Sequence, residues 1–442
     1  MKTNKSKKNV ERDRSLETPK GVRDFLPEQK ILREQIVDVL KKVFERYGFN
    51  PIETPALEML KTLVKETDSA TDAFNEIYRL EDQGGRKLAL KYDQTVPFGR
   101  VVAQNPQLGT PFKRYQIDRS WRDGPIKLGR YREFWQCDVD IAGASSMIAD
   151  AEYLAIVTDV FKEFEIKVEF RINNRKLVEG VLKYAGIPKK QWMAATIIID
   201  KLDKIGDSGV LDEARQKGIN DDAMVKVLDI LSQKGTNLQI LKQIESFVDD
   251  DLVSEAISEL RQVLKYGAAF GAKNIKLVPS LARGLSYYTG TIFETYVVGS
   301  PVKSSVVGGG RFDNMIGDFV GKNVTVPAVG LSFGLDVIYD TLVSMKRVVP
   351  NKTVVKVFVV PLKTEVQCIK IVTELRNAGI NADIDLIGRS ISKNLQYANK
   401  LDIPYVILAG QSELKKGKLN LKDMKSGKEQ KLTIQQIIKK LK

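Results

Sequence analysis

The chain has 442 residues, enough for about three domains at the usual ~100–200 residues each. Hydrophobic residues make up 43% and charged residues 29%, so the chain can bury a core and is not a disordered protein. Its two cysteines, Cys137 and Cys368, are too few for a disulfide framework or a zinc site built from cysteine. Histidine is absent, which excludes Ser-His-Asp and Cys-His nucleophile systems and HExxH metalloproteases.

The charge is unevenly distributed along the chain. Of the net charge of +14, residues 351–442 contribute +10, residues 1–17 contribute +3, and the body between them is nearly neutral. A basic C-terminal module suits binding to a polyanion such as a nucleic acid, although lysine used for solubility gives the same bias. We expect residues 1–17 to form a disordered basic arm. The chain lacks a membrane-length apolar run and an apolar signal-peptide stretch, so we expect a cytoplasmic protein.

The N-terminal half is predicted to contain one long helix followed by strands. The helix runs from Pro27 to about Tyr47, because apolar residues recur at helical spacing and a glycine follows. Residues 49–58 include Pro51 and Pro55, which predicts an edge strand or an interface segment. Three strand-like runs follow, KLALKYDQT, PFKRYQIDRSW and REFWQCDVDIAG. Their short connections favour an antiparallel sheet.

The remaining chain indicates an insertion and a separate C-terminal domain. Residues 172–278 read as amphipathic helices, and the strand pattern returns in residues 279–347. We therefore predict one discontinuous sheet-based domain, residues 18–171 and 279–347, with a helical insertion between its parts. Residues 348–442 alternate strand and helix, which predicts a small α/β domain with a mixed sheet.

Asp93, Gln94 and Thr95, in the run KYDQT, are the first group suited to binding or catalysis. They offer a carboxylate, an amide and a hydroxyl at the end of a predicted strand. The same residues also suit an ordinary exit from a strand into a turn, and taken alone they favour that interpretation.

The second group lies on two predicted strands joined by a loop rich in glycine and proline. The loop and its flanks carry Arg119, Arg122, Arg130 and Arg132. Guanidinium groups bind phosphate in a bidentate manner and stack on bases, so this hairpin can close over a nucleotide. Gln136, Asp138 and Asp140 alternate along the second strand and so project from one face. That face is either a binding site or a solvated sheet surface.

The third group is LARGLSYYTG, followed by GGGRFD. Arg283 lies in an apolar strand-like run beside Tyr287 and Tyr288, and burying it is costly unless it meets an anion. The triple glycine before Arg311 is weak evidence, because glycine serves any tight turn. Neither GxxxxGK[ST] nor GxGxxG occurs, so the sequence does not support a P-loop or a dinucleotide fold.

Together these segments resemble class II aminoacyl-tRNA synthetases, and among them the histidyl-tRNA synthetases. The likeness runs from about Thr18 to Lys442. RYGFNPIETPALE is similar to motif 1, RSWRDGPIKLGRYREFWQCDVDIAG to motif 2 and VPAVGLSFGLDVI to motif 3. The most specific segment is LARGLSYYTGTIFE, which resembles the histidine-specific RGLDYYTG. The C-terminal module resembles the anticodon-binding domain of these enzymes.

The resemblance implies a fold, a reaction and partners. The fold is α+β, with an antiparallel-sheet catalytic domain, a helical insertion and an anticodon-binding domain. The reaction joins L-histidine and ATP into histidyl-adenylate and then charges the 3′ end of tRNA(His). Mg²⁺ is expected to arrive with ATP through its phosphate oxygens. The implied assembly is a homodimer with motif 1 at its interface.

The resemblance also assigns roles to individual residues. The catalytic residues are Arg122 and Arg283, which hold and neutralise the α-phosphate. Asp93, Thr95 and Gln136 match positions that bind the substrate's ammonium group. Asp140, Tyr287 and Tyr288 match positions around the imidazole. The full set expected to contact histidine is Asp93, Gln94, Thr95, Arg122, Gln136, Asp140, Arg283, Tyr287 and Tyr288. The set expected to contact ATP is Arg122, Arg130, Arg132 and Arg311.

Three positions depart from the family pattern. Ser286 stands where aspartate is usual, Phe312 where tyrosine is common, and Val337 where motif 3 carries an arginine that stacks on adenine. Val337 supports an alternative, a catalytically silent relative that regulates another enzyme or senses tRNA. The basic C-terminal domain and the retained Arg283 argue for the enzyme. A synthetase for another amino acid is a third possibility.

Overall fold

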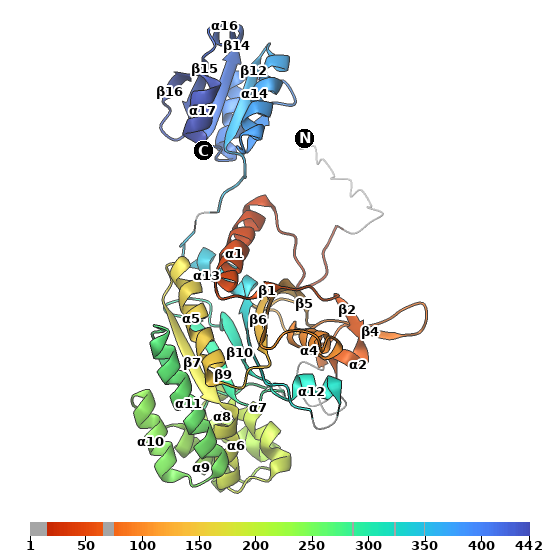
Figure 1. Ribbon diagram of the computed structural model, residues 1–442, viewed down its shortest axis with the longest axis vertical. Coiled ribbons are helices and arrows are strands. Elements are labelled where there is room, and N and C mark those ends of the chain that lie inside the picture. The colour runs from red at the N-terminus through yellow and green to blue at the C-terminus, as the bar shows by residue number, and fades with distance from the viewer. Residues whose placement is uncertain (1–15, 65–74, 285–286, 322–323, 349) are drawn as a thin grey trace, which may run out of the picture. The chain divides into compact units, whose positions relative to one another are not determined.

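The computed structural model describes residues 16–64, 75–284, 287–321, 324–348 and 350–442 (Figure 1). The chain forms two compact units. Of the described residues, one unit holds 16–24 and those between 36 and 347, and the other holds 25–35 and those between 348 and 442. The basic arm expected at residues 1–17 lies outside the described residues except for its last two positions. Within the described ranges, the helices are too short or too polar to cross a bilayer.

An eight-stranded mixed sheet is the centre of the first unit. Its strand order is β1-β5-β6-β11-β10-β9-β7-β8. The bounds are β1 Asn50–Pro51, β5 Phe112–Trp121, β6 Glu133–Ala142, β7 Val168–Asn174, β8 Ile275–Leu277, β9 Thr291–Val297, β10 Val307–Arg311 and β11 Ala328–Gly334. The six central strands are antiparallel as predicted, but both outer pairs, β1–β5 and β7–β8, are parallel. The edge strand predicted near Pro51 is confirmed, because β1 is the outermost strand of the sheet. Proline is tolerated there, since an edge strand leaves some backbone amides outside the hydrogen-bond ladder.

Two long helices belong to this part of the chain, and the second of them is hydrogen-bonded to the sheet. Helix α1 (Pro27–Arg46) matches its predicted bounds to within one residue. Helix α5 (Met147–Glu163) begins where Ser146 Oγ accepts a hydrogen bond from the Ile148 amide. The Tyr153 hydroxyl on α5 donates to the carbonyls of Val139 in β6 and Val329 in β11, at 3.2 and 2.9 Å. These bonds fix the helix against the two strands that carry the site.

A small second sheet stands beside the main one. It has the order β2-β4-β3, with β2 Leu57–Met59, β3 Arg79–Glu81 and β4 Lys87–Leu90. The predicted strand KLALKYDQT is β4, so it belongs to this sheet and not to the main one. Helix α2 (Leu60–Leu63) packs against β2 and β4. Helix α4 (Thr95–Gln104) packs against α2 and against α12 (Met315–Val320) (Figure 1). The chain therefore leaves β4 and enters α4 directly through Asp93 and Gln94.

The segment predicted as helical, residues 172–278, contains α6 Arg175–Tyr184, α7 Trp192–Ile199, α8 Leu202–Gln216, α9 Asp221–Leu231, α10 Asn237–Phe247 and α11 Asp251–Ala269. It begins inside β7 and ends just after β8, and both strands belong to the main sheet. Helix α11 packs against α5 and α6, and α5 and α11 lie along one face of the sheet (Figure 1). The helical segment is thus anchored to the sheet at both ends.

The second unit is a separate α/β domain, as predicted. Its five-stranded mixed sheet has the order β13-β12-β14-β15-β16. The strands are β12 Val357–Leu362, β13 Ala382–Ile384, β14 Tyr405–Gly410, β15 Leu419–Asp423 and β16 Glu429–Leu432. The helices are α14 Glu365–Asn377, α15 Ile391–Lys400, α16 Gln411–Lys415 and α17 Ile434–Leu441. Strands β12–β14 are parallel and the β15–β16 hairpin is antiparallel.

Candidate active site

The centre of the sheet presents a polar face. Gln136, Asp138 and Asp140 alternate along β6, so all three project from one side. Their partners in β11 are the small residues Gly334, Ser332 and Gly330. A Cβ at Gly330 would lie 1.9 Å from Asp140 Oδ1, so only glycine leaves room for that carboxylate. The face predicted from alternation is therefore the floor of a hollow and not an exposed surface.

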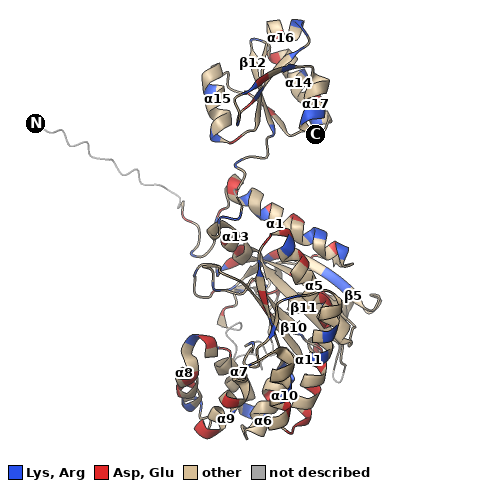
Figure 2. Ribbon diagram, turned by 90° about the vertical axis from the view of Figure 1, so that its left-hand side faces the viewer, with Lys and Arg blue, Asp and Glu red and all other residues tan. Residues whose placement is uncertain are grey.

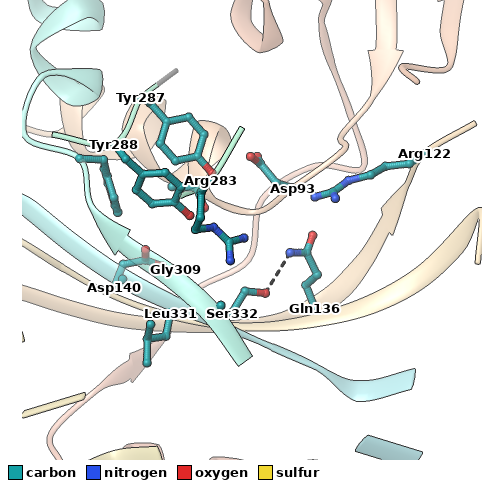
Figure 3. A pocket seen from close by; sticks show the side chains of 14 residues that line it. Asp93, Arg122, Gln136, Asp140, Arg283, Tyr287, Tyr288, Gly309, Leu331 and Ser332 are labelled. Carbon is teal, nitrogen blue, oxygen red and sulfur yellow. Dashed lines mark hydrogen bonds between the residues drawn. The ribbon is translucent and has the colours of Figure 1, made fainter. Parts of the chain in front are cut away.

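An inner pocket of about 40 Å³ opens above this floor (Figure 3). Eight of the residues predicted to bind substrate line it: Asp93, Thr95, Arg122, Gln136, Asp140, Arg283, Tyr287 and Tyr288. They come from the β4–α4 connection and the first residue of α4, from the end of β5, from within β6, and from the segment before β9. The rest of the lining comes from β10, β11 and Phe312.

Two guanidinium groups reach this pocket from distant parts of the sequence. Arg122 follows β5, and its Nε donates to the Tyr92 carbonyl at 2.9 Å. Arg283 Nη1 contacts Glu294 Oε1 at 2.9 Å, and the Tyr296 hydroxyl donates to the other oxygen of Glu294. Figure 3 shows both guanidinium groups pointing toward the same hollow. The pairing with Glu294 offsets the cost of placing the Arg283 charge in a largely buried position.

Three buried carboxylates lie under the pocket and carry perturbed acidities. Loss of solvent raises the pKa of Asp138 to about 6 and that of Asp140 to about 8. Arg114 Nη2 lies 2.7 Å from Asp140 Oδ2 and lowers its pKa, but desolvation and the neighbouring carboxylates outweigh this effect. Burial also raises the pKa of Asp93. Burial is the largest cause of all three shifts, so these carboxyl groups hold their protons more tightly than in water, and a cationic ligand would favour their ionised forms.

Several buried polar atoms at the pocket lack hydrogen-bond partners among the described residues. They are Asp93 Oδ2, Gln136 Oε1 and Arg283 Nε. The other oxygen of Asp93 accepts from the Val96 amide at 3.1 Å, which fixes the side chain at the start of α4. Buried polar groups in native proteins are normally satisfied, so these atoms favour a polar ligand in the pocket.

The far end of the pocket is aromatic. The rings of Tyr287 and Tyr288 have centroids 4.8 Å apart, and Phe312 meets Tyr287 edge-on at 6.1 Å. Burial raises the pKa of both tyrosines, so both phenols stay protonated at neutral pH. Phe312 supplies a ring and no hydroxyl at this point. The departure at Ser286 lies outside the described residues.

A larger outer pocket of about 380 Å³ adjoins the inner one. The two share Arg122, Gln136, Arg283, Gly308 and Ser332. Aromatic and apolar residues line part of the outer pocket, including Tyr131, Phe134 and Val337. Lys127, Arg130, Lys204 and Lys303 line it as well. Such a lining suits a molecule with a flat apolar end and an anionic end.

The comparisons with known proteins agree with this geometry. A family model for histidyl-tRNA synthetase matches residues 21–338, and one for the anticodon binding domain matches residues 356–442. The chain belongs to the histidyl-tRNA synthetase family. Histidine–tRNA ligase 1 of Bacillus cereus is 42% identical over 418 residues, which cover 94% of this chain and 97% of that protein.

Solved structures support membership of the same synthetase family. The histidyl-tRNA synthetase from Nostoc sp. has a TM-score of 0.84 at 32% identity, covering 97% of this chain and 99% of that one. A Bacillus halodurans protein described as an ATP phosphoribosyltransferase regulatory subunit/histidyl-tRNA synthetase has a TM-score of 0.73. It covers 86% of this chain and 96% of that one, but at 21% identity it shows the fold alone.

Three residues predicted from the synthetase motifs lie away from both pockets. Gln94 is buried and its amide donates to the Arg119 carbonyl and to Ser120 Oγ, both at 3.2 Å. Arg132 contacts Asp123 at 2.9 Å and supports its own loop. Arg311 is 2% exposed and pairs with Asp150 and Asp313, so it joins β10 to α5. None of the three lines either pocket, so the geometry does not favour the predictions that Gln94 binds histidine and that Arg132 and Arg311 bind ATP.

Arg130 remains at the nucleotide side of the synthetase site, but it is paired. It lines the outer pocket, and its Nη2 lies 2.7 Å from Glu76 Oε1. An arriving phosphate must therefore compete with Glu76 for this guanidinium. The pair is solvent-exposed, and exposed pairs contribute only about 0–1 kcal/mol, so the exchange costs little.

Sequence analysis missed residues that hold the predicted ones in place. Arg114 faces Asp140 across the β5–β6 ladder, and Glu294 binds Arg283. Ser332 Oγ accepts a hydrogen bond from the Gln136 amide at 2.9 Å. Arg114 lies in the same predicted strand as Arg119, and an arginine in an alternating run was an available signal. Glu294 and Ser332 carry no comparable signal before the strand pairing is known.

Proposed function

We propose that this chain is a histidine–tRNA ligase. It activates L-histidine with ATP, forming histidyl-adenylate and pyrophosphate, and transfers the histidyl group to the 3′ end of tRNA(His). The observation that carries this proposal is the position of Arg122 and Arg283 at the junction of a small carboxylate-rich pocket and a larger cationic one. An α-phosphate at that junction meets the amino acid on one side and the rest of ATP on the other.

In the inner pocket, Asp93, Thr95 and Gln136 bind the ammonium group of histidine. Asp93 Oδ2 and Gln136 Oε1 are the unpartnered acceptors that this group requires. Asp140, Tyr287 and Tyr288 surround the imidazole, which must both donate and accept hydrogen bonds. Phenols and a carboxylate can satisfy both nitrogens, and an amino acid lacking them leaves the site unpaired.

The chemical step needs positioning and charge neutralisation. The carboxylate oxygen of histidine attacks the α-phosphorus, a phosphorus–oxygen bond forms, and pyrophosphate leaves with the bridging oxygen. Arg122 and Arg283 stabilise the charge on the α-phosphoryl oxygens from two sides. The 3′-terminal hydroxyl of tRNA then attacks the carbonyl carbon of the adenylate, and AMP leaves.

The second unit supports tRNA as the partner. Lysines lie on both α15 and α17, namely Lys393, Lys400, Lys439 and Lys440 (Figure 2). A groove on α15 is lined by Arg389, Lys393, Lys400 and Tyr397, and the Arg389 guanidinium lies 4.3 Å from the Tyr397 ring centroid. Cations that track phosphates beside an aromatic ring that stacks bases are typical of single-stranded RNA binding. We assign this domain, residues 348–442, to the anticodon arm.

Further parts of the proposal concern assembly and conditions. We propose a homodimer because β1 leaves an open sheet edge and because Leu57 and Leu80 in the small sheet are 47% and 43% exposed. Mg²⁺ enters bound to ATP, through its phosphate oxygens.

A cytoplasmic location follows from tRNA as the substrate. The catalytic domain consists of residues 18–171 and 279–347, interrupted by the helical insertion.

Histidine-dependent ATP–pyrophosphate exchange tests the proposal. We expect exchange with L-histidine and none with proline, threonine or glycine, followed by charging of tRNA(His) in a second assay. A catalytically silent regulator, the alternative favoured by Val337, gives no exchange with any of these amino acids. Exchange with proline, threonine or glycine in place of histidine would instead identify a different synthetase.

Replacing Val337 with arginine tests how the base is held. Val337 is half-buried in the outer pocket, and a Cβ on Gly129 would lie 3.6 Å from its methyl groups. An arginine here can stack on adenine, and such contacts contribute about 0.5–2 kcal/mol. We expect Val337→Arg to lower the KM for ATP about threefold to tenfold without changing the KM for histidine. Val337→Leu is the matched control, and an equal effect of both variants would contradict stacking.

A further inference from the structure

The helical insertion contributes a cation to the outer pocket. Lys204 lies in the first turn of α8, within the insertion, yet it lines this pocket together with Arg122 and Arg283. It does not line the inner pocket. The family motifs that predicted the site do not include this lysine.

The backbone around Lys204 has an unusual shape. Helix α8 is broken at Gly206, where φ is 68° and ψ is 177°. This conformation is accessible essentially to glycine alone. The break separates the turn that carries Lys204 from the rest of the helix, so this turn can follow the pocket wall while the helix takes another direction.

Among the cations that line the outer pocket, Lys127 and Lys204 are exposed and available to a ligand, and of the two only Lys204 belongs to the helical insertion. Arg130 is paired with Glu76, and Lys303 Nζ donates to the Ser300 carbonyl at 3.2 Å. Lys204 forms no ion pair within 4 Å with any residue the structure describes. Burial raises the pKa of the nearby Asp200 to about 6, although the charges of Arg283 and Lys204 oppose the shift. An exposed ammonium group at a pocket wall binds phosphate as a point charge.

The position of Lys204 indicates which part of ATP it meets. The α-phosphate belongs at Arg122 and Arg283, because these residues line both pockets. The adenine fits the apolar part of the wall around Phe134 and Val337. The β- and γ-phosphates are then left to the cations that line the outer pocket alone. Lys204 is one of these, and it shares a wall with Glu294, the partner of Arg283.

We propose that Lys204 binds the β- and γ-phosphates of ATP and the departing pyrophosphate, so that the insertion takes part in nucleotide binding. This inference rests on the proposed ligase activity. A charge-assisted hydrogen bond to phosphate can change the affinity for ATP about tenfold. Because Lys204 is exposed to solvent and salt screens its charge, we take about tenfold as the largest effect to expect.

The test compares Lys204→Met with Lys201→Met in the full-length protein. Lys201 precedes the same helix, pairs with Glu213 and lines neither pocket. For Lys204→Met we expect a KM for ATP raised about fivefold to tenfold, an unchanged KM for histidine, and partial recovery in Lys204→Arg. Lys201→Met is expected to match the wild type. The increase in the KM for ATP caused by Lys204→Met should be smaller at high salt, because salt screens the charge of Lys204 in the wild type.

Direct binding measurements separate the phosphates. Isothermal titration calorimetry should show weaker binding of ATP and of pyrophosphate to Lys204→Met, with AMP binding unchanged. Equal losses for AMP and ATP, or no loss for either, would overturn the proposal for Lys204. If the wild-type protein gives no histidine-dependent exchange, the ligase activity fails instead, and calorimetry still decides whether Lys204 binds pyrophosphate.

Discussion

Replacing Arg283 with alanine is expected to lower histidine-dependent ATP–pyrophosphate exchange about a thousandfold. Arg283 and Arg122 lie at the junction of the two pockets, where charge develops on the phosphoryl oxygens during attack. Fixed donors aimed at such charge contribute about 10²–10³-fold each, and arginines that act on transferred phosphoryl groups contribute about 10³–10⁵-fold. The loss should fall mainly on kcat, because the interaction strengthens in the transition state.

The alanine variant alone could lose activity through damage to the fold. Removing Arg283 leaves Glu294 without its partner in a mostly buried position, which is destabilising. The double variant Arg283→Gln/Glu294→Gln removes both charges and avoids this problem. We expect it to unfold at about the wild-type temperature and still lose exchange about a thousandfold. Arg215→Ala, at a surface ion pair in the insertion, is the control and should keep full activity.

Two outcomes would contradict the assigned role of Arg283. The first is a double variant with near-normal kcat, which would mean that Arg283 serves only to hold Glu294. The second is a loss confined to the KM for ATP, which would mean equal binding of the ground state and the transition state. Single-turnover formation of the adenylate, followed in a rapid-quench experiment, distinguishes the chemical step from pyrophosphate release.

Local patterns were enough to predict most elements of the fold. Helix α1 and strands β5 and β6 can each be predicted from about ten to twenty consecutive residues. The signals are the spacing of apolar residues and the proline, glycine or polar residues at the ends of the element. Strand order is a different kind of information. Strand β4 has the same alternation as β5 but pairs in the small sheet, and the parallel edge strand β8 is only three residues long. Such pairings depend on contacts between distant segments, which no local window contains.

The residues of the site likewise fall into those that a local motif reveals and those that depend on contacts between distant segments. Residues whose chemistry is visible in a motif, such as Arg122 and Tyr288, reach the pocket as predicted. Three predicted side chains, those of Gln94, Arg132 and Arg311, have the right chemistry but line neither pocket and contact other groups. Arg311 lies only three residues from Gly308, which lines the pocket, yet it turns to Asp150 on α5. Lys204 shows the converse, because its helix carries no binding motif and only the fold brings it to the pocket.

Replacing Asp93 with asparagine is expected to raise the KM for histidine by a factor of a hundred or more. Asp93 Oδ2 is buried, lacks a partner among the described residues, and lines the inner pocket. Losing one member of a buried hydrogen-bonded charge pair costs about 2–5 kcal/mol, which corresponds to roughly 30-fold to several thousandfold in affinity. Asparagine keeps the bond from the Val96 amide through its own oxygen, so the start of α4 should remain intact. The KM for ATP should not change.

The same substitution should make the ligand-free protein more stable at neutral pH. Burial raises the pKa of Asp93 above its ordinary value of 3.8, so the folded state binds a proton more tightly than the unfolded chain. Stability therefore falls as pH rises through the interval between those two values, because the buried group must ionise. Asparagine removes that cost. We expect Asp93→Asn to unfold at a higher temperature than the wild type at pH 8, with the difference shrinking toward pH 4.

Asp82→Asn provides a control with the opposite sign. Hydrogen bonds from Arg86 lower the pKa of the exposed Asp82, so its contribution is present at neutral pH and is lost as pH falls through the folded value. This variant should keep the wild-type KM for histidine. If Asp93→Asn were instead less stable at pH 8, the carboxylate would be a structural group with a partner, and its weak histidine binding would carry no information on the substrate.

Bound histidine can be observed directly, because the chain contains no histidine of its own. Imidazole resonances from isotope-labelled L-histidine then arise from the ligand alone. In wild type, binding should weaken as the pH falls, because Asp93, which lines the pocket and has a raised pKa, takes up a proton and because the ligand's own imidazole becomes charged below about pH 6.5. In Asp93→Asn that pH dependence should be reduced together with the affinity. An unchanged pH profile in the variant would mean that Asp93 does not bind the ammonium group and that the profile comes from the ligand's own imidazole, which titrates at about pH 6.5.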